Sequence, residues 1–139
     1  MSAVVRYTDV EAGTELPEQA FPVTRADLVR YAGASGDFNV IHWNERVATE
    51  VGLPGVIAHG MLTLGLVGRA VTDWTDGAEV VELVAKFTAP VAVPDDDDGV
   101  ELVVAGTVKA VEDGLTTLAL VVTSGDKKVL GNPRAVVRA

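Results

Sequence analysis

The fold is decided by the stretch Met61-Leu-Thr-Leu-Gly-Leu-Val-Gly-Arg-Ala-Val-Thr-Asp-Trp74, which is apolar almost all round. A helix with apolar side chains on every face is typical of a buried element. Gly65 and Gly68 each lower helix propensity by about 1 kcal/mol, so their presence indicates that a sheet or another helix approaches closely. The stretch is shorter than the roughly 20 apolar residues of a membrane span. We therefore expect a buried helix and no interaction with a membrane.

From Glu79 onward the sequence changes to a period of two. Segments rich in valine, leucine and threonine predict strands. These strands are expected at residues 80–88, 100–111, 115–124 and 128–138, with a shorter one near residues 19–23. The tight-turn sequences Glu-Asp-Gly and Ser-Gly-Asp separate three of them. The sequence therefore predicts an α+β fold, in which one long apolar helix lies against an antiparallel sheet.

Two shorter helices are predicted ahead of the long one. Thr24 supplies the hydroxyl cap of a helix start, and Gly33 and Gly36 end that helix. Asn44 caps a second helix over residues 45–51. Between these two helices we expect an irregular loop.

The whole sequence has 139 residues, 20 acidic and 11 basic side chains, a formal net charge of −9 and no cysteine. This length fits one domain, which we expect to span residues 1–139. The negative charge argues against a nucleic-acid partner. The lack of cysteine excludes disulfides and thiolate-held metal clusters. Residues 1–13 lack the apolar core of a secretory signal peptide, so we expect a cytoplasmic protein.

Two groups of polar residues resemble metal sites. Asp95-Asp-Asp-Asp98 followed by Gly99 has the glycine of a calcium loop, but proline and alanine stand where the first and last ligands should be. We interpret this run as a solvated turn between strands. Asp37, His42 and His59 could form a two-histidine, one-carboxylate site. Because nothing else in the sequence supports such a site, we expect no metal.

The loop after the first helix concentrates Asp37, Asn39 and His42 within six residues. Gly36 lets the backbone take a conformation that other residues avoid, so the carboxylate and the imidazole can point at one small site. Histidine titrates near neutrality and aspartate is a ready base, which suits acid–base chemistry. The alternative stays open that Asp37 and Asn39 are turn formers and that His42 is a hydrogen-bonded core histidine.

A second segment, Ala58-His-Gly-Met-Leu62, opens the long helix. The N-terminus of a helix presents free N–H groups and a partial positive charge. Gly60, which has no side chain, would let a substrate oxygen approach such an N–H closely, as a thioester carbonyl that becomes an enolate requires. The alternative is that His59 and Gly60 form a plain turn at the helix entry.

Together these segments resemble the MaoC-like hydratase/dehydratase family, whose hot-dog fold wraps an antiparallel sheet around a long central helix. Ser35-Gly-Asp-Phe-Asn-Val-Ile-His42 is similar to the family signature S/T-G-D-x-N-P-hydrophobic-H. His59-Gly-Met61 is similar to the signature at the start of the central helix, and Phe87-Thr-Ala-Pro-Val91 to a strand motif. Val40 stands where the family has proline. Without proline the unfolded loop has more conformational freedom, which typically lowers stability by about 0.4–1 kcal/mol. The change removes no titrating group.

Three strings resemble, more narrowly, the B-type catalytic subunit of actinobacterial (3R)-hydroxyacyl-acyl-carrier-protein dehydratase. They are Leu28-Val-Arg-Tyr-Ala-Gly33, Ile41-His-Trp43 and Ile57-Ala-His-Gly-Met-Leu-Thr63. The resemblance implies reversible syn addition of water to a trans-2-enoyl thioester, run as dehydration in fatty acid elongation. It implies a homodimer or a heterodimer with a related hot-dog subunit, and an acyl carrier protein as a candidate partner. It implies no cofactor, because the acyl substrate arrives on the phosphopantetheine of acyl carrier protein or coenzyme A.

The resemblance also implies roles for individual residues. Asp37 and His42 would be catalytic and hold the reacting water, and the Gly60 N–H would bind the thioester oxygen. Residues expected to support the loop or meet the substrate are Ser35, Asn39 and His59. Candidates for the acyl tunnel, or for the core as the favoured alternative, are Met61, Leu62 and Leu64. Candidates for carrier binding, against a merely solvated surface, are Lys86, Arg134, Lys127 and Lys128.

Two other functions remain as alternatives. An (R)-specific enoyl-CoA hydratase of fatty acid breakdown or polyester precursor supply would use the same residues. A non-catalytic acyl-binding hot-dog subunit would not need Asp37, His42 and Gly60 together, so their presence argues against it.

Overall fold

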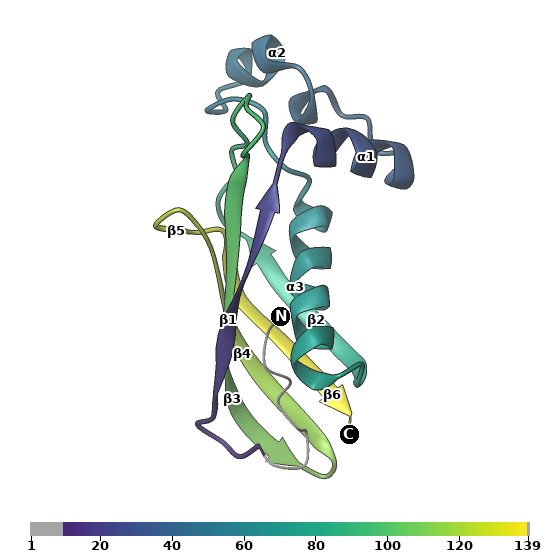
Figure 1. Ribbon diagram of the computed structural model, residues 1–139, viewed down its shortest axis with the longest axis vertical. Helices are drawn as coiled ribbons and strands as arrows, with labels where there is room; N and C mark the ends of the chain where they lie inside the picture. The colour runs from purple at the N-terminus through teal and green to yellow at the C-terminus, as the bar shows by residue number, and fades with distance from the viewer. Residues whose placement is uncertain (1–9, 139) are drawn as a thin grey trace.

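The structure, a computed structural model, describes residues 10–138. Residues 1–9, on which most of the signal-peptide argument rests, and residue 139 lie outside the described part. Strands, helices and one short 3-10 helix (η2) follow one another along the chain as shown in Figure 1. Their bounds are β1 Glu15–Val23, α1 Arg25–Ser35, η2 Val40–His42, α2 Glu45–Glu50, α3 Gly60–Thr75, β2 Glu79–Phe87, β3 Val100–Glu112, β4 Leu115–Ser124, β5 Lys127–Lys128 and β6 Leu130–Arg138.

The strands form one antiparallel sheet in the order β1-β3-β4-β6-β2, with β5 paired to β4. The long helix α3 runs along one face of this sheet, and α1 and α2 lie at the end of the molecule where α3 begins (Figure 1). The expected α+β arrangement of one long helix against an antiparallel sheet is confirmed.

The core lies between α3 and the sheet. From α3 it takes Val67, Ala70, Val71 and Trp74, all fully buried. The indole of Trp74 donates a hydrogen bond of 2.7 Å to the backbone carbonyl of Pro17 in β1, so its one polar atom is satisfied. This packing fixes the second half of α3 against the sheet, and the helix carries the candidate site at its other end.

The expectation that α3 is buried all round is wrong. Met61 is 59% exposed, and Gly65 and Arg69 on the same helix are also exposed. The sheet covers only one side of α3, which leaves the other side outward-facing among residues 10–138. A Cβ on Gly68 would lie 3.6 Å from Leu83 of β2, whereas one on Gly65 would meet nothing within 4 Å. Gly68 therefore faces β2 at ordinary van der Waals distance, and the close approach that the glycines predicted is not found at Gly65.

Helix α1 starts as predicted and ends at Gly36, the second of the two glycines predicted to end it. Thr24 and Asp27 form a capping box at its N-terminus. The helix passes through Gly33, where glycine costs propensity without breaking the turn. It ends at Gly36, whose φ of 77° and N–H bond of 2.9 Å to Ala32 O make a left-handed C-cap.

The strand predicted over residues 128–138 is in fact interrupted at Val129. The N–H of Val129 donates to Val122 O of β4 at 3.0 Å, and its carbonyl accepts from Thr88 N, just beyond β2, at 3.1 Å. At this residue pairing with β2 begins, and the ladder with β4 is interrupted until Arg134, which splits the stretch into β5 and β6. Val129, its chain neighbour Leu130 and its hydrogen-bond partner Thr88 all line the cavity described below.

Candidate active site

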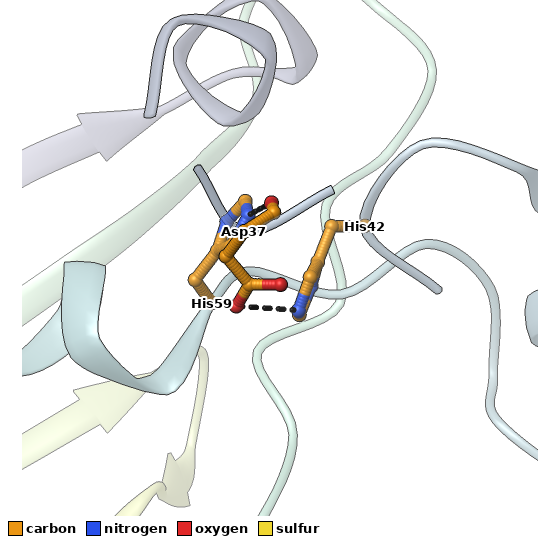
Figure 2. Close-up of side chains that lie close together, drawn as sticks. All are labelled: Asp37, His42 and His59. Atoms are coloured by element: carbon orange, nitrogen blue, oxygen red, sulfur yellow. Dashed lines mark hydrogen bonds and ion pairs between the residues drawn. The ribbon is translucent and has the colours of Figure 1, made fainter. Parts of the chain in front are cut away.

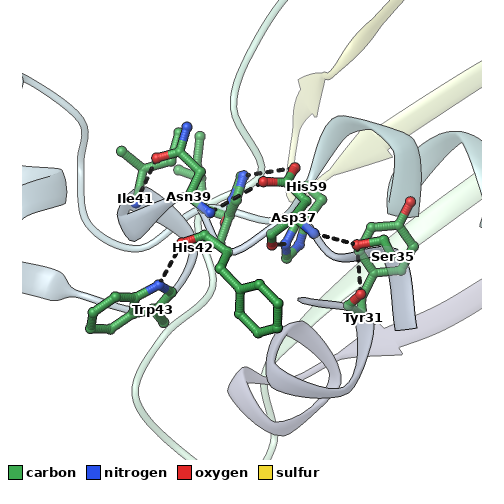
Figure 3. Close-up of polar contacts among 10 residues, drawn as sticks. Tyr31, Ser35, Asp37, Asn39, Ile41, His42, Trp43 and His59 are labelled. Carbon is green, nitrogen blue, oxygen red and sulfur yellow. Dashed lines mark hydrogen bonds and ion pairs between the residues drawn. The ribbon is translucent and has the colours of Figure 1, made fainter. Parts of the chain in front are cut away.

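The loop between α1 and η2 is held by its own side chains (Figure 3). Ser35 Oγ accepts from Asp37 N at 3.1 Å, Asp37 Oδ1 accepts from Asn39 N at 3.2 Å, and Asn39 Oδ1 accepts from Ile41 N at 3.3 Å. Ser35 Oγ also donates to Tyr31 O at 2.7 Å. Each of these side chains bonds the backbone two residues on, a local turn that serine, asparagine and aspartate favour. The expected role of Ser35 and Asn39 as loop supports agrees with these contacts.

This loop brings the Asp37 carboxylate to the His42 imidazole (Figure 2). Asp37 Oδ2 lies 4.0 Å from His42 Nε2, and the side chain of Asp37 is 52% exposed whereas that of His42 is 9% exposed. Since Asp37 Oδ1 accepts from the backbone, the carboxylate has one oxygen anchored and one directed to the imidazole. The structure therefore brings together the two residues that the sequence singled out for acid–base chemistry.

The buried partner of His42 decides which ring nitrogen is protonated. His42 Nδ1 lies 2.7 Å from the backbone carbonyl of Ile57. Because a carbonyl oxygen can only accept, Nδ1 carries the proton and a neutral ring presents the Nε2 lone pair to Asp37. Two acceptors 4.0 Å apart can share one water that donates a hydrogen bond of about 2.8 Å to each. This arrangement holds a water by both protons and leaves its oxygen lone pairs available.

The first turn of α3 supplies unpaired N–H groups beside these two residues. The N–H groups of Leu62 and Thr63 donate to the His59 carbonyl at 3.1 and 3.2 Å. Those of Gly60 and Met61 have no acceptor within the described chain. The side chain of His59 makes no cap hydrogen bond, although it stands at the N-cap position. The start of α3 therefore keeps two donors free, with the positive end of the helix dipole behind them.

Gly60 also meets a steric requirement. A Cβ at this position would lie 3.0 Å from ring carbons of Phe87, the last residue of β2. Since contacts this short force a neighbour to move, glycine is the residue that leaves both the Phe87 ring and the N–H in place.

A cavity of about 490 Å³ joins these groups. Its polar rim includes Asp37, His42 and the Gly60 backbone. Its remaining wall is largely apolar. It comes from the end of β2 and the segment after it, from the start of β6, and from residues beside the rim such as Ile41, Ile57 and Met61. A mostly apolar cavity with a few convergent polar groups is typical of a small-molecule site.

Comparison with known proteins places the chain in a family. The model of the MaoC like domain matches residues 9–126. The chain belongs to the MaoC-like family.

Two of its relatives are named dehydratases. The 3-hydroxyacyl-thioester dehydratase X of Mycobacterium tuberculosis is 37% identical over 78 residues, which cover 56% of this chain and 27% of that protein. A solved structure described as a MaoC-like dehydratase is 35% identical with a TM-score of 0.90, covering 99% of this chain and 43% of its own. The MaoC-like chain thus spans less than half the length of either relative.

A third similar structure is an assembly of two differently named chains. It is the ChsH1-ChsH2 complex from Mycobacterium tuberculosis, to which the chain is 25% identical with a TM-score of 0.78. The match covers 93% of this chain and 96% of the solved one. The hot-dog fold expected from the family resemblance is confirmed by these structures.

The hydrophobic candidates on α3 are not brought together. Met61 lines the cavity and is largely exposed, so its favoured assignment to the core is wrong. Leu62 packs against the core and faces a different groove, between α1, β1 and α3. Leu64 is half-buried and is not among the residues that line the cavity. Helical spacing turns Leu62 away from Met61, whereas Leu64 lies one turn further along the side of Met61, past the residues that line the cavity.

Of the basic candidates for carrier binding, Arg134 is already paired. Its guanidinium contacts the carboxylate of Glu82 across β6 and β2. Lys86 is exposed, directly precedes the cavity residue Phe87, and makes no ion pair within residues 10–138. Lys127 and Lys128 of β5 are likewise exposed and without an ion pair in the described chain.

Three residues that contact the site were not singled out from the sequence. The Ile57 carbonyl holds His42, Tyr31 lies edge-on to the His59 ring at 4.7 Å, and Phe87 covers Gly60. A backbone carbonyl leaves no signal in a sequence. Phe87 lies in the strand motif quoted above, which could have indicated it.

The Asp37, His42 and His59 side chains offer ligand atoms that lie within 4.8 Å of one another. Each imidazole already gives one nitrogen to a backbone carbonyl, Ile57 O for His42 and Asp37 O for His59. This cluster is the arrangement in which a metal would have to be held. No helix in the described chain has the length and apolar character needed to cross a membrane.

Proposed function

We propose that this MaoC-like chain catalyses the reversible dehydration of (3R)-hydroxyacyl thioesters to trans-2-enoyl thioesters. The observation that carries the proposal is the 4.0 Å spacing of Asp37 Oδ2 and His42 Nε2 beside the free N–H of Gly60. A hydration reaction needs a held water, a base and a donor for the thioester oxygen, and these three groups supply them. The dehydratase names of the relatives support the same reaction class.

In the hydration direction, Asp37 and His42 hold the water while the enoyl group lies in the cavity. The water oxygen forms a bond to C3 as Asp37 takes one of its protons. The electron pair of the C2–C3 double bond moves toward the thioester oxygen, where the Gly60 N–H stabilises the enolate. The pair of side chains then returns a proton to C2 on the face that received the oxygen. The net change is addition of one water, so the side chains end as they began.

The proposed reaction uses no redox cofactor and no metal. The acyl chain arrives on phosphopantetheine. Lys86 and Lys128, which directly precede the cavity residues Phe87 and Val129, are exposed basic side chains available for its phosphate. Activity that survives exhaustive chelation supports this mechanism. Activity that chelation abolishes and one divalent ion restores would assign a metal to Asp37, His42 and His59 instead.

The exposed rim of the cavity supports pairing with a second hot-dog chain, as in the two-chain complex of similar fold. We propose a homodimer or a heterodimer with a related subunit. We further propose that residues 1–139 act as one domain in the cytoplasm.

The decisive experiment mixes purified protein with trans-2-butenoyl-CoA and follows the loss of enoyl absorbance. The product is then resolved by chiral chromatography. We expect the (3R)-hydroxy product. An (3S) product would overturn the proposed geometry, and a folded protein that binds the thioester without turnover would identify a non-catalytic acyl-binding subunit.

A comparison of the same acyl group carried on coenzyme A and on acyl carrier protein distinguishes the two related enzyme functions. A higher kcat/KM on the carrier protein supports a role in elongation. A higher value on coenzyme A supports an (R)-specific enoyl-CoA hydratase.

A further inference from the structure

The imidazole of His59 is buried beneath the candidate site, although the proposed chemistry gives it no proton to carry. The residue is 1% exposed. Its Nε2 lies 3.1 Å from the backbone carbonyl of Asp37. Its ring stacks on that of His42, with centroids 3.8 Å apart and planes inclined by 23°. His59 thus contacts both members of the Asp37–His42 pair, one through its backbone and the other through its ring (Figures 2 and 3).

The hydrogen-bond partners determine the protonation of His59. The Asp37 carbonyl can only accept, so Nε2 carries a proton. Nδ1 is buried and has no partner among the described residues. A neutral ring leaves only an unpaired acceptor there, whereas a charged ring would bury an unpaired N–H together with its charge, which is more costly. The contacts therefore select the neutral tautomer with the proton on Nε2.

The groups around the ring act on this equilibrium in both directions. Burial lowers the pKa of His59 below its ordinary value, the hydrogen bond to the Asp37 carbonyl opposes this, His42 lowers it further, and the Asp37 charge raises it. Tyr31 of α1 contacts the ring edge. Because burial is the largest of these effects, the net direction agrees with the neutral tautomer.

We propose that His59 is a positioning residue, which fixes the Asp37–His42 spacing by donating to the Asp37 backbone and by supporting the His42 ring. This role rests on the proposed function of Asp37 and His42. The Asp37 side chain is half-exposed, and the bonds from Ser35, Asp37 and Asn39 lie within its own loop. The bond from His59 instead ties the Asp37 backbone to the start of α3. Misplacement of a reacting group by about 1 Å can cost about 100-fold in rate, which gives such an anchor a large effect.

Two substitutions separate the two contacts. His59→Phe keeps a flat ring against His42 and removes the N–H donor. His59→Gln keeps an N–H near the Nε2 position and removes the ring. Tyr31→Phe is the matched control, because it keeps the aromatic contact with His59 and removes only a hydroxyl.

We expect His59→Phe to lower kcat for enoyl-thioester hydration by about 10-fold to 100-fold with KM changed by less than about twofold. The Gly60 donor and the cavity wall remain, so binding is preserved. His59→Gln should recover part of the lost kcat, and Tyr31→Phe should match the wild type. Circular dichroism and thermal unfolding establish the folded fraction, by which each kcat is divided.

A fully folded His59→Phe variant with wild-type kcat would overturn the role of His59 while leaving the proposed function intact. A rise in KM as large as the fall in kcat, in both variants, would indicate general damage to the site. This result would also overturn the role of His59. A wild-type protein without hydratase activity would overturn the proposed function, and this role with it.

A measurement on the wild type tests the tautomer without any substitution. Long-range 1H–15N NMR spectra distinguish the protonated and unprotonated nitrogens of each imidazole. We expect His59 to be neutral with the proton on Nε2 at pH 7. A proton on Nδ1, or a charged ring at that pH, would contradict the proposed donor to Asp37.

Discussion

Asp37 and His42 contribute to the site in different ways. His42 is nearly buried and has its Nδ1 proton fixed by Ile57 O, whereas the Asp37 carboxylate is half-exposed and held through one oxygen. A buried, oriented imidazole beside an accessible carboxylate can hold a water without closing the site to substrate. The same two side chains on a flexible loop would share the sequence pattern and lack this orientation.

Removing either group should therefore abolish most of the turnover. Asp37→Asn keeps the shape of the side chain and removes the base, and His42→Gln removes the titrating partner. We expect each to lower kcat by about 100-fold or more, the usual scale for a general acid or base. Absorbance of a short enoyl-CoA measures the rate, and circular dichroism checks folding. Near wild-type rates in two folded variants would rule out this pair as the catalytic residues.

His59 should make stability depend on pH. Its pKa is lowered in the folded protein from 6.5, chiefly by burial, so the unfolded chain binds the proton more readily. The stability that this residue contributes is present above the unfolded pKa and is lost as pH falls through 6.5 toward the folded value. Urea unfolding at pH 7.5 and 5.5 should show a larger loss for the wild type than for His59→Gln. An equal loss in both proteins would show that the burial of His59 is not what destabilises the fold at low pH.

At the scale of elements, the loop between α1 and η2 acquires rigidity in a way that the sequence did not reveal. The valine at position 40 suggested a looser loop than a proline would give. The structure instead shows consecutive side chain-to-backbone bonds from Ser35, Asp37 and Asn39. These bonds depend on local conformation, and a sequence gives the residue types without the torsions that bring them into range.

Restoring the proline tests whether this loop is already in the conformation that the family uses. Asn39 has φ −55° and ψ 128°, the extended conformation that a residue before proline favours. The N–H of Val40 makes no hydrogen bond within residues 10–138. Val40→Pro should therefore raise the free energy of unfolding by about 0.4–1 kcal/mol with kcat unchanged, as measured by urea unfolding and the hydration assay. A destabilised variant would mean that the backbone at residue 40 does not fit proline.

The elements that the sequence predicted well are those with a strong local signal. The period of two gave the strand β4 at its observed bounds, and the Glu-Asp-Gly turn before it has Asp113 and Gly114 at positive φ, as a tight hairpin requires. The break at Val129 and the exposed side of α3 could not be predicted in this way. Both depend on which strand or face the chain meets in three dimensions.

At the scale of the whole molecule, charge is distributed in an uneven pattern. Every arginine among residues 10–138 pairs with a carboxylate. The lysines of the same range make no ion pair, and they are Lys86, Lys109, Lys127 and Lys128. An unpaired lysine beside the cavity can attract the phosphate of the carrier in an otherwise acidic protein.

Charge reversal at one lysine beside the cavity and one away from it tests this attraction. Lys86→Glu should raise KM for an enoyl-CoA by about threefold at low salt, the scale of an exposed charge pair, with kcat unchanged. The N-acetylcysteamine thioester, which lacks phosphate, should show no change. Lys109→Glu on β3 makes the same change in net charge and serves as the control. Equal shifts in KM for the two variants would show that net charge, and not Lys86, sets carrier affinity.

The two edges of the sheet differ in how they can meet another chain. The β1 edge carries Pro17 and Pro22 and a bulge between Leu16 and Gln19, features that disfavour pairing with another strand. The pairing of β2 with β6 also shifts register twice, but the β2 edge has no proline and exposes apolar side chains along its length. They are Val80, Val81, Val84 and Phe87. The β2 edge lies next to the cavity, so a chain that pairs there would also complete the cavity wall.

We therefore expect the protein to dimerise through β2, with activity on short acyl chains when alone and on long chains only with a related partner subunit. Each buried methylene contributes roughly 0.8 kcal/mol, so a missing wall penalises long chains most. Val84→Lys on β2 should give a monomer by light scattering, whereas Val121→Lys, at an exposed position of the interior strand β4, should remain a dimer. Rates over a series of enoyl chain lengths, with and without the co-purified partner, measure the second effect. A monomer with full activity would overturn the assembly. A homodimer that hydrates long and short chains equally well would overturn the need for a partner, because its own second copy would then supply the whole wall.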